Sequence, residues 1–354
     1  MKHTKMATDP NELLREAKEK TRKELKRPNI LVCGYTGTGK TSLIQSICGK
    51  AIVPDSKIGA GCPLTKFYDN YESPLINFYD SRGFEAGQTE EEFTDGTSKF
   101  IRDIQDKPDV DQHIHIVWYC IQGSGARVTD CDINLIKNIF TNVIVVITKR
   151  DITRDNQFEA MKDRLLSAGV SPSKIIAVSD QNLESHKKLV DLTYEMLPSA
   201  YKDAFMSAQN VNLEKKDAIA QVWIHASAAS AAAVGATPIP ISDAFIISGI
   251  QVALLVKLCH LYNFLDESVK TPMMILATEQ IGILTAGSLV KFFPAIGSFI
   301  QATVAATLTE ALGHLANNYL KDCFMARAKN EPLPKMYGHN EIKKWILNIG
   351  GNNK

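Results

Sequence analysis

A glycine-rich segment near the start of the chain has the residue types and spacing of a phosphate-binding loop. Its glycines would let backbone N–H groups wrap a β-phosphate at a helix start, Lys40 would reach the β- and γ-phosphates, and Thr41 could bind Mg²⁺. A plain glycine-rich turn is the alternative, but a predicted strand before the segment and a predicted helix after it favour the phosphate loop. We expect nucleotide contacts from Gly34, Thr36, Gly37, Thr38, Gly39, Lys40, Thr41 and Ser42.

A second motif, Asp80-Ser81-Arg82-Gly83, follows the next apolar run. A carboxylate at the end of a strand can hold the Mg²⁺ shell, and a glycine just after it can turn its N–H toward a γ-phosphate. The sequence therefore predicts Thr41 and Asp80 as metal ligands, and Lys40 and Gly83 as groups that stabilise the transferred phosphate.

A third motif, Thr148-Lys149-Arg150-Asp151, follows another apolar run and suits a guanine base. Its last carboxylate can accept from both N1–H and the N2 amine of guanine, while the Lys149 stem covers the purine plane. Adenine has no such pair of donors, so GTP and GDP are the expected ligands. Taken alone, the motif could be a solvated loop, but its order and spacing favour base binding. The predicted base-binding residues are Thr148, Lys149, Asp151 and Ser179.

Short β-branched and aromatic runs alternate with helical stretches between residues 28 and 197. Near-continuous apolar runs of this kind suit parallel strands that are covered on both faces. The predicted strands are Asn29–Cys33, Leu75–Tyr79, His113–Ile121, Asn142–Thr148 and Lys174–Val178. This pattern predicts a doubly wound α/β domain with a mostly parallel sheet.

The chain changes character near residue 200, where the strand signals stop. Residues 218–265 hold two formal charges and residues 271–320 hold three, while Ala, Leu and Ile recur at helical spacing. An all-helical second domain is therefore expected. We predict a lead-in helix within residues 1–27, the α/β domain over 28–197, the helical domain over 198–330 and a tail over 331–354.

Composition narrows the class of protein. The 354 residues include 40 Lys+Arg and 39 Asp+Glu, which describes a globular chain of about two domains and gives no reason to expect nucleic acid as a partner. Seven cysteines form no CxxC pair, and the N-terminus reads as a charged helix, Pro10–Lys26, rather than a signal peptide. A reducing, cytoplasmic location is expected.

These motifs together resemble the translation-factor class of P-loop GTPases, with five recognisable motifs across residues 28–195. The resemblance implies a GTPase that hydrolyses GTP to GDP and phosphate with Mg²⁺. It also implies that Thr65, in Pro63-Leu64-Thr65-Lys66, is a catalytic residue that meets Mg²⁺ and the γ-phosphate. The alternative for Thr65 is an ordinary loop threonine.

Two longer strings resemble a subgroup of that class. Gly59–Lys66, followed by Asp80–Glu85, looks like Era-like GTPases that carry a C-terminal helical domain of unknown function, the YcjF-like domain. Pro238–Ala244 is similar to the Pro-x-Pro-x-x-Asp signature of that domain. A weaker likeness is to the interferon-inducible immunity-related GTPases, which dimerise through their G domains and act at membranes.

Two positions depart from the patterns of these relatives. Phe84 stands where many small GTPases have a Gln that orients the attacking water, so we expect slow intrinsic hydrolysis. Gly37 stands where some Era-like relatives bind K⁺ through an Asn, which puts the potassium route in doubt. The missing group would come from backbone atoms, a partner or a second copy in a G-domain homodimer. Arg127 is the candidate for a stabilising cation, and a plain surface arginine is its alternative.

The helical domain leaves a choice between a packed core and a membrane surface. The stretch Ala218–Ser242 is long enough to span a bilayer, but its polar residues and two prolines favour a packed helix over a span. Contact with a membrane surface or an effector protein is the second interpretation. The rival function is a GTP-binding interaction or membrane-associated scaffold protein with negligible hydrolysis, and a P-loop kinase would leave Thr148–Asp151 unexplained.

Overall fold

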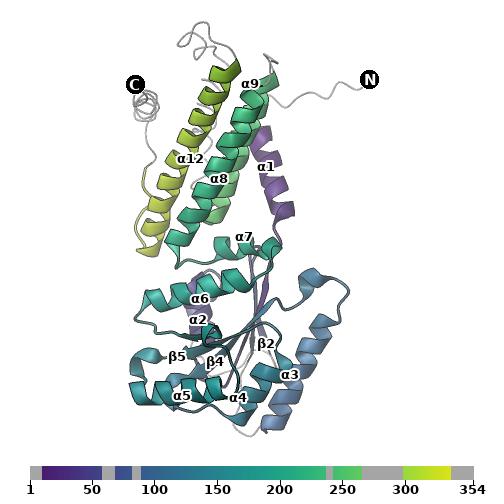
Figure 1. The fold of residues 1–354 in the computed structure, drawn as a ribbon, viewed down its shortest axis with the longest axis vertical. Helices are drawn as coiled ribbons and strands as arrows, with labels where there is room; N and C mark the ends of the chain where they lie inside the picture. Colours follow the sequence, from purple (N-terminus) through teal and green to yellow (C-terminus); the bar gives the residue numbers. More distant parts are fainter. Residues whose placement is uncertain (1–9, 58–67, 82–88, 237–241, 265–297, 336–354) are drawn as a thin grey trace. The chain divides into compact units, whose positions relative to one another are not determined.

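The structure is a computed structural model that describes residues 10–57, 68–81, 89–236, 242–264 and 298–335. The chain divides into two compact units (Figure 1). One is Leu25–Asn212 and contains the sheet; the other joins Met1–Glu24 with Leu213–Lys354 and is helical in its described part. The sheet unit thus continues past residue 197, because helix α7 (Ser199–Ala208) and the residues up to Asn212 belong to it.

The sheet has six strands in the order β2-β3-β1-β4-β5-β6. All neighbouring pairs are parallel except β2 and β3, which are antiparallel. The bounds are β1 Asn29–Cys33, β2 Tyr68–Glu72, β3 Asn77–Ser81, β4 Ile116–Gln122, β5 Val143–Thr148 and β6 Ile175–Ala177. The predicted α/β class with a mostly parallel sheet is confirmed. The strand order reverses direction at β1, and ligands of open α/β sheets bind at such a point.

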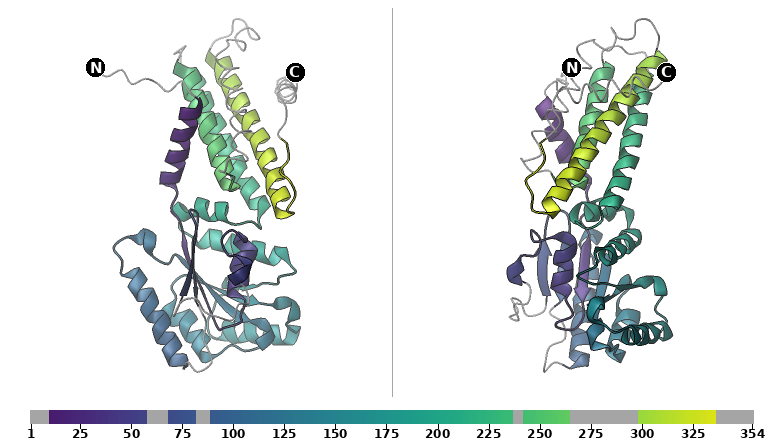
Figure 2. Two further views of the ribbon diagram at one scale, coloured as in Figure 1. Left: turned by 180° about the vertical axis from the view of Figure 1, so that it is seen from behind. Right: turned by 90° about the vertical axis from the view of Figure 1, so that its left-hand side faces the viewer.

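Helices cover both faces of this sheet (Figure 2), and this explains its continuous apolar strands. One face packs Leu31 and Val117 against α3, α4 and α5. On the other face, Trp118 donates a 3.0 Å hydrogen bond from Nε1 to Thr193 of α6. The helices are α2 Lys40–Cys48, α3 Glu90–Gln105, α4 Asp130–Asn134, α5 Asp155–Ser167, α6 Leu183–Met196 and α7.

The described part of the helical unit contains α1 Pro10–Glu24, α8 Leu213–Gly235, α9 Ser242–Leu261 and α12 Ser298–Ala328. Helix α8 packs against α9 and α12, and α1 packs against α9 (Figure 2). A Cβ on Gly313 would lie 2.7 Å from Ile224 Cγ1, so the glycine lets α12 approach α8 closely. The predicted lead-in helix therefore packs against another helix of its unit.

Among the helices that the structure describes, α8 is long and apolar enough to cross a membrane by length and composition. Its first turns nevertheless carry a buried charge. Lys216 is fully buried, and its Nζ donates a 2.7 Å hydrogen bond to the Leu261 carbonyl. Aromatic rings of Tyr262 and Phe324 lie 5.9 and 5.2 Å from the same ammonium, so this lysine is held in place by α9 and α12.

Candidate functional site

The phosphate-type loop begins where β1 ends, in the middle of the sheet. All five residues of β1 are buried, which fixes the start of the loop. Gly34 has φ of 142°, and a Cβ there would lie 2.1 Å from the Cys120 carbonyl oxygen of β4. A larger residue would push the loop off the sheet. Gly37 and Gly39 have φ of 78° and 89°, a backbone conformation that other residues rarely adopt.

Lys40 is the first residue of α2 and is buried inside this loop. Its Nζ donates to the carbonyl oxygens of Gly34 at 3.0 Å and Tyr35 at 2.9 Å. Thr38 also donates its hydroxyl to the Tyr35 carbonyl, at 2.9 Å. The loop therefore folds around the lysine, and it holds a single positive charge at the N-terminus of a helix, where anions bind favourably.

Thr41 and Asp80 come together beside this lysine. The Thr41 hydroxyl donates a 2.6 Å hydrogen bond to Asp80 Oδ2, while Asp80 Oδ1 is buried with no hydrogen-bond partner in the described part of the chain. Burial raises the pKa of Asp80 to about 6, against the Lys40 charge and the Thr41 hydrogen bond, which lower it. A buried carboxylate oxygen without a donor is a feature that a cation would satisfy.

Mg²⁺ prefers a few oxygen ligands plus water and phosphate oxygens, so the Thr41 hydroxyl and the Asp80 carboxylate fit this ion. A dedicated cluster of three or more His, Cys, Asp or Glu side chains suited to a metal is absent from the residues that the structure describes. Asp80 lies within β3, whereas the sequence placed it just after the strand.

The predicted base-binding motif lies at the end of β5 and is joined to the phosphate-type loop. The buried Thr148 hydroxyl donates a 2.6 Å hydrogen bond to the Thr38 carbonyl. Lys149 has φ of 55°, and its Nζ donates to the Gly37 carbonyl at 2.9 Å. These bonds connect two motifs that are more than a hundred residues apart in the sequence.

The other residues predicted to bind the base lie in the segments that follow β5 and β6. Arg150 N–H donates to the Val178 carbonyl at 3.0 Å, which ties the β5 loop to the segment after β6. Ser179 is buried in that segment, and its Oγ accepts from Gln181 N–H at 3.3 Å. Asp151 is exposed, so its carboxylate is accessible to a ligand.

Some of the remaining predicted site residues lie outside the described part of the chain, and the others are exposed or half-buried. Thr65 and Gly83 lie outside the described residues, as do Arg82 and Phe84. Arg127 is exposed on the loop that follows β4 and η3 (Gly123–Gly125). Thr36 is exposed and Ser42 half-buried, at the tip of the loop and in the first turn of α2.

Sequence reasoning missed the role of Tyr35, whose side chain leaves the loop. Its hydroxyl lies 3.1 Å from Thr129 Oγ1, the N-cap of α4, and its ring lies 6.2 Å from that of Phe93 in α3. Thr129 in turn pairs with the buried Asp132, which also accepts from Tyr119. Tyr35 thereby attaches the loop to the first turns of α3 and α4. The sequence feature that could have predicted this role is a tyrosine inside a glycine-rich motif.

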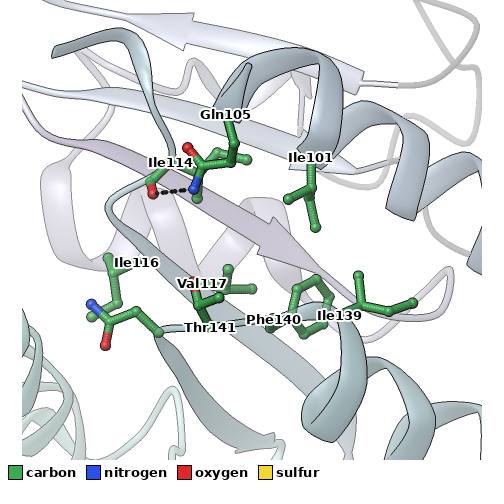
Figure 3. A pocket seen from close by; sticks show the side chains of 9 residues that line it. Ile101, Gln105, Ile114, Ile116, Val117, Ile139, Phe140 and Thr141 are labelled. Carbon is green, nitrogen blue, oxygen red and sulfur yellow. Dashed lines mark hydrogen bonds between the residues drawn. The ribbon is translucent and has the colours of Figure 1, made fainter. Parts of the chain in front are cut away.

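A small pocket lies near the amino ends of β4 and β5 (Figure 3), whereas the phosphate-type loop lies at the carboxyl end of β1. Its lining includes Ile114, Val117, Phe140 and Gln105, whose Nε2 donates a 3.2 Å hydrogen bond to the Ile114 carbonyl. The pocket has room for about one water molecule. It is unrelated to the phosphate-type loop, because that loop follows the carboxyl end of β1.

Comparisons with known proteins agree with this arrangement at a coarse level. No family model matches the chain. It is 24% identical over 175 residues to Septin CDC11 of Candida albicans, an alignment that covers 42% of this chain and 44% of that protein. The chain thus spans less than half the length of the curated relative it matches. This distant similarity supports a GTPase-like kind of protein.

Proposed function

We propose that this chain binds GTP and Mg²⁺ and hydrolyses GTP to GDP and phosphate. The observation that carries the proposal is the hydrogen bond from Thr148 to the Thr38 carbonyl, which joins a base-type motif to a phosphate-type loop. A glycine-rich turn without a ligand has no need of that connection. The similarity to a septin, a member of a P-loop GTPase family, supports the same assignment.

Each end of the nucleotide has a set of residues in this proposal. Lys40 and the N–H groups that start α2 hold the β- and γ-phosphates, while Asp151 accepts from the N1–H and N2 amine of guanine. Lys149 covers the purine with its stem, since its Nζ is anchored on Gly37. The specificity for guanine rests on a carboxylate that accepts two hydrogen bonds at once, which adenine cannot donate.

Thr41 and Asp80 would hold Mg²⁺ in this proposal, together with Thr65. When bound, the ion neutralises charge that develops on the β- and γ-phosphate oxygens. Lys40 stabilises the same charge from the loop, because its ammonium is buried and fixed by two carbonyls. The chain supplies position and charge rather than a covalent group.

We propose slow hydrolysis in the isolated chain, since Phe84 cannot orient a water molecule. Gly83, the backbone of the loop and Arg127 are the groups of this chain that could assist, and a second copy in a G-domain homodimer or another partner could supply a cation. The exposed position of Arg127 suits delivery to a site that forms on association.

The helical unit is proposed to read out the nucleotide state in the manner of a molecular switch. From the sequence, Era-like GTPases with a helical domain are one model for this arrangement, and the immunity-related GTPases are a weaker one. The second candidate function is a GTP-binding scaffold in the cytoplasm or on a membrane surface. It is favoured by Phe84 and by α8, whose length and hydropathy would suit contact with lipid.

Calorimetry and single-turnover kinetics test these functions together. The wild-type chain should bind GTP and GDP with Mg²⁺ and should cleave bound GTP, whereas Lys40→Ala should bind neither nucleotide. Binding without cleavage over many hours would favour the scaffold. Unchanged GTP affinity in Lys40→Ala would overturn the phosphate-loop assignment.

A further inference from the structure

The last two carbonyl groups of helix α2 accept hydrogen bonds from Asn210, which lies near the C-terminal end of the sheet unit in the sequence. Asn210 N–H donates a 2.7 Å hydrogen bond to the Ile47 carbonyl, and Asn210 Nδ2 donates a 2.8 Å hydrogen bond to the Cys48 carbonyl. The last carbonyls of a helix have no partners within the helix. Asn210, which follows Cys48 by 162 residues in the sequence, is the hydrogen-bond donor to two of these carbonyls.

Gly49 packs closely against Asn210 where helix α2 ends. Gly49, which follows α2, has φ of 87°, and a Cβ there would lie 3.0 Å from Asn210 Nδ2. Its own N–H caps the Gln45 carbonyl, so the helix ends sharply where Asn210 enters. Helix α2 is only nine residues long, and its other end carries Lys40 and Thr41. A shift of these residues along the helix axis would therefore reach Asn210.

The segment around Asn210 is braced as a short rigid strap. Buried Gln209 accepts at Oε1 from both Val211 N–H and Asn212 N–H, each at 2.8 Å. Asn212 Nδ2 donates to Asp191 of α6 at 2.9 Å. The next residue, Leu213, begins α8 of the helical unit. The strap is therefore the last stretch of the sheet unit, and the chain passes from it directly into the first residue of α8.

We infer that Asn210 is a positioning residue that transmits the nucleotide state from α2 to the start of α8. Directional hydrogen bonds at 2.7 and 2.8 Å weaken steeply when their geometry changes. A displacement of α2 must either move the strap or break both bonds, and either result changes α8 at its first turn. The inference rests on the proposed function, and the difference in nucleotide affinity between the two states limits its size.

Hydrogen–deuterium exchange on the full chain tests this role. Uptake in α8 is compared between GDP and a non-hydrolysable GTP analogue, with Mg²⁺, in the wild type and in Asn210→Ala. We expect a nucleotide-dependent difference in the wild type and a clear reduction of it in Asn210→Ala, which removes the side-chain bond to the Cys48 carbonyl and keeps the backbone bond to the Ile47 carbonyl. Nucleotide affinity should change by about tenfold or less, as for one hydrogen bond. Asn210→Asp fills the same space but turns oxygens toward the helix carbonyls. Asn210→Asp should reduce the difference as well, and it replaces Asn210→Ala in the test if the alanine variant does not fold.

Asn212→Ala is the matched control, since its side-chain bond joins the strap to α6, and its removal leaves both Asn210 bonds to α2 in place. It should keep the difference in α8. Retention of the difference in both Asn210 variants, or its equal loss in Asn212→Ala, would overturn the inference. If deuterium uptake in α8 of the wild type is the same with GDP and the GTP analogue although calorimetry shows nucleotide binding, the inference that α8 responds to the nucleotide is wrong. The proposal that the chain binds GTP is unaffected by that result.

Discussion

The hydroxyl of Thr148 donates a 2.6 Å hydrogen bond to the backbone carbonyl of Thr38, and both residues are buried. One end of this bond belongs to the motif proposed to bind the base, the other to the loop proposed to bind phosphate. The bond therefore fixes the distance between the two halves of the proposed nucleotide site. Such preorganisation improves binding because less order has to be created on association.

Thr148→Val should weaken GTP and GDP binding by about tenfold, because the Thr38 carbonyl is left buried without its donor. Valine has the shape of threonine, so packing in β5 should persist. Thr193→Val is the control: it removes another buried threonine hydroxyl, which accepts from Trp118 in the same unit. Calorimetry should show the loss in Thr148→Val alone. An equal loss in both variants would indicate general destabilisation.

Asp151→Asn should change the preferred base from guanine to xanthine. The amide can donate to the extra xanthine oxygen, whereas the carboxylate can accept only from donors such as those of guanine. Competition between GTP and XTP for the purified variant measures the change. Asp151→Ala should lose affinity for both, and selectivity for GTP in Asp151→Asn would show that another residue reads the base.

Asp80→Asn should separate stability from Mg²⁺-dependent binding. The pKa of Asp80 is raised to about 6, mainly by burial, so the ionised carboxylate destabilises the metal-free fold above that pH. At pH 8 the amide should raise the free energy of unfolding by about 1 to 2 kcal/mol. The same change should reduce the effect of Mg²⁺ on GTP affinity.

Urea unfolding without metal and GTP titrations with Mg²⁺ or EDTA check both parts of this prediction. Asp132→Asn serves as the control, since Asp132 is another buried carboxyl group with a raised pKa, but it caps α4 and accepts from Tyr119. It should lower stability and leave the response to Mg²⁺ unchanged. A lower stability of Asp80→Asn at pH 8 would contradict the burial argument.

Hydrolysis per molecule should rise with protein concentration, because Phe84 offers no group to orient water. The rate of GTP cleavage is measured over a hundredfold range of concentration, with Arg127→Ala beside the wild type. If a second copy supplies Arg127, the variant should keep the basal rate and lose the rise. Arg102→Ala, an exposed arginine of α3, is the control. A flat rate in the wild type would remove self-activation.

The sequence predicted five of the six strands of the described sheet and missed the edge strand β2. The strand Asn29–Cys33 was predicted with both bounds, since buried parallel strands are continuously apolar. Strand β2, Tyr68–Glu72, was missed because its polar residues suit an edge strand that is only partly covered. The third strand was placed two residues early at each end, since Asp80 and Ser81 are polar although buried.

Motif residues were predictable because their chemistry recurs with fixed spacing, whereas the contacts between motifs were not. The bond from Thr148 to Thr38 and the cap from Asn210 to α2 join segments that are 110 and 162 residues apart. No local pattern encodes such pairs, because they depend on where the sheet places each loop. The packing of α1 on α9 has the same origin.

The last prediction concerns acid stability of the sheet unit through His115. Its Nδ1 accepts a 2.9 Å hydrogen bond from Asn29 N–H, its ring centroid lies 3.8 Å from that of Tyr201, and its buried Nε2 has no partner in the described part of the chain. Burial lowers the pKa of His115 to about 4, although the nearby Asp111 raises it. The neutral ring is therefore the form that the fold accommodates.

As the pH falls from about 6.5 to 4, the unfolded chain binds a proton at this histidine before the folded chain does, so stability decreases over that range. The shift corresponds to at most about 3 kcal/mol, and partial exposure should reduce it to about 1 to 2 kcal/mol. His115→Asn keeps an acceptor for Asn29 N–H and cannot titrate. It should be less stable than the wild type at pH 7.5, and this difference should narrow by about 1 to 2 kcal/mol at pH 4.5. Urea midpoints of the two proteins at both pH values measure the narrowing, and a constant difference would show that His115 charges without penalty in the folded chain.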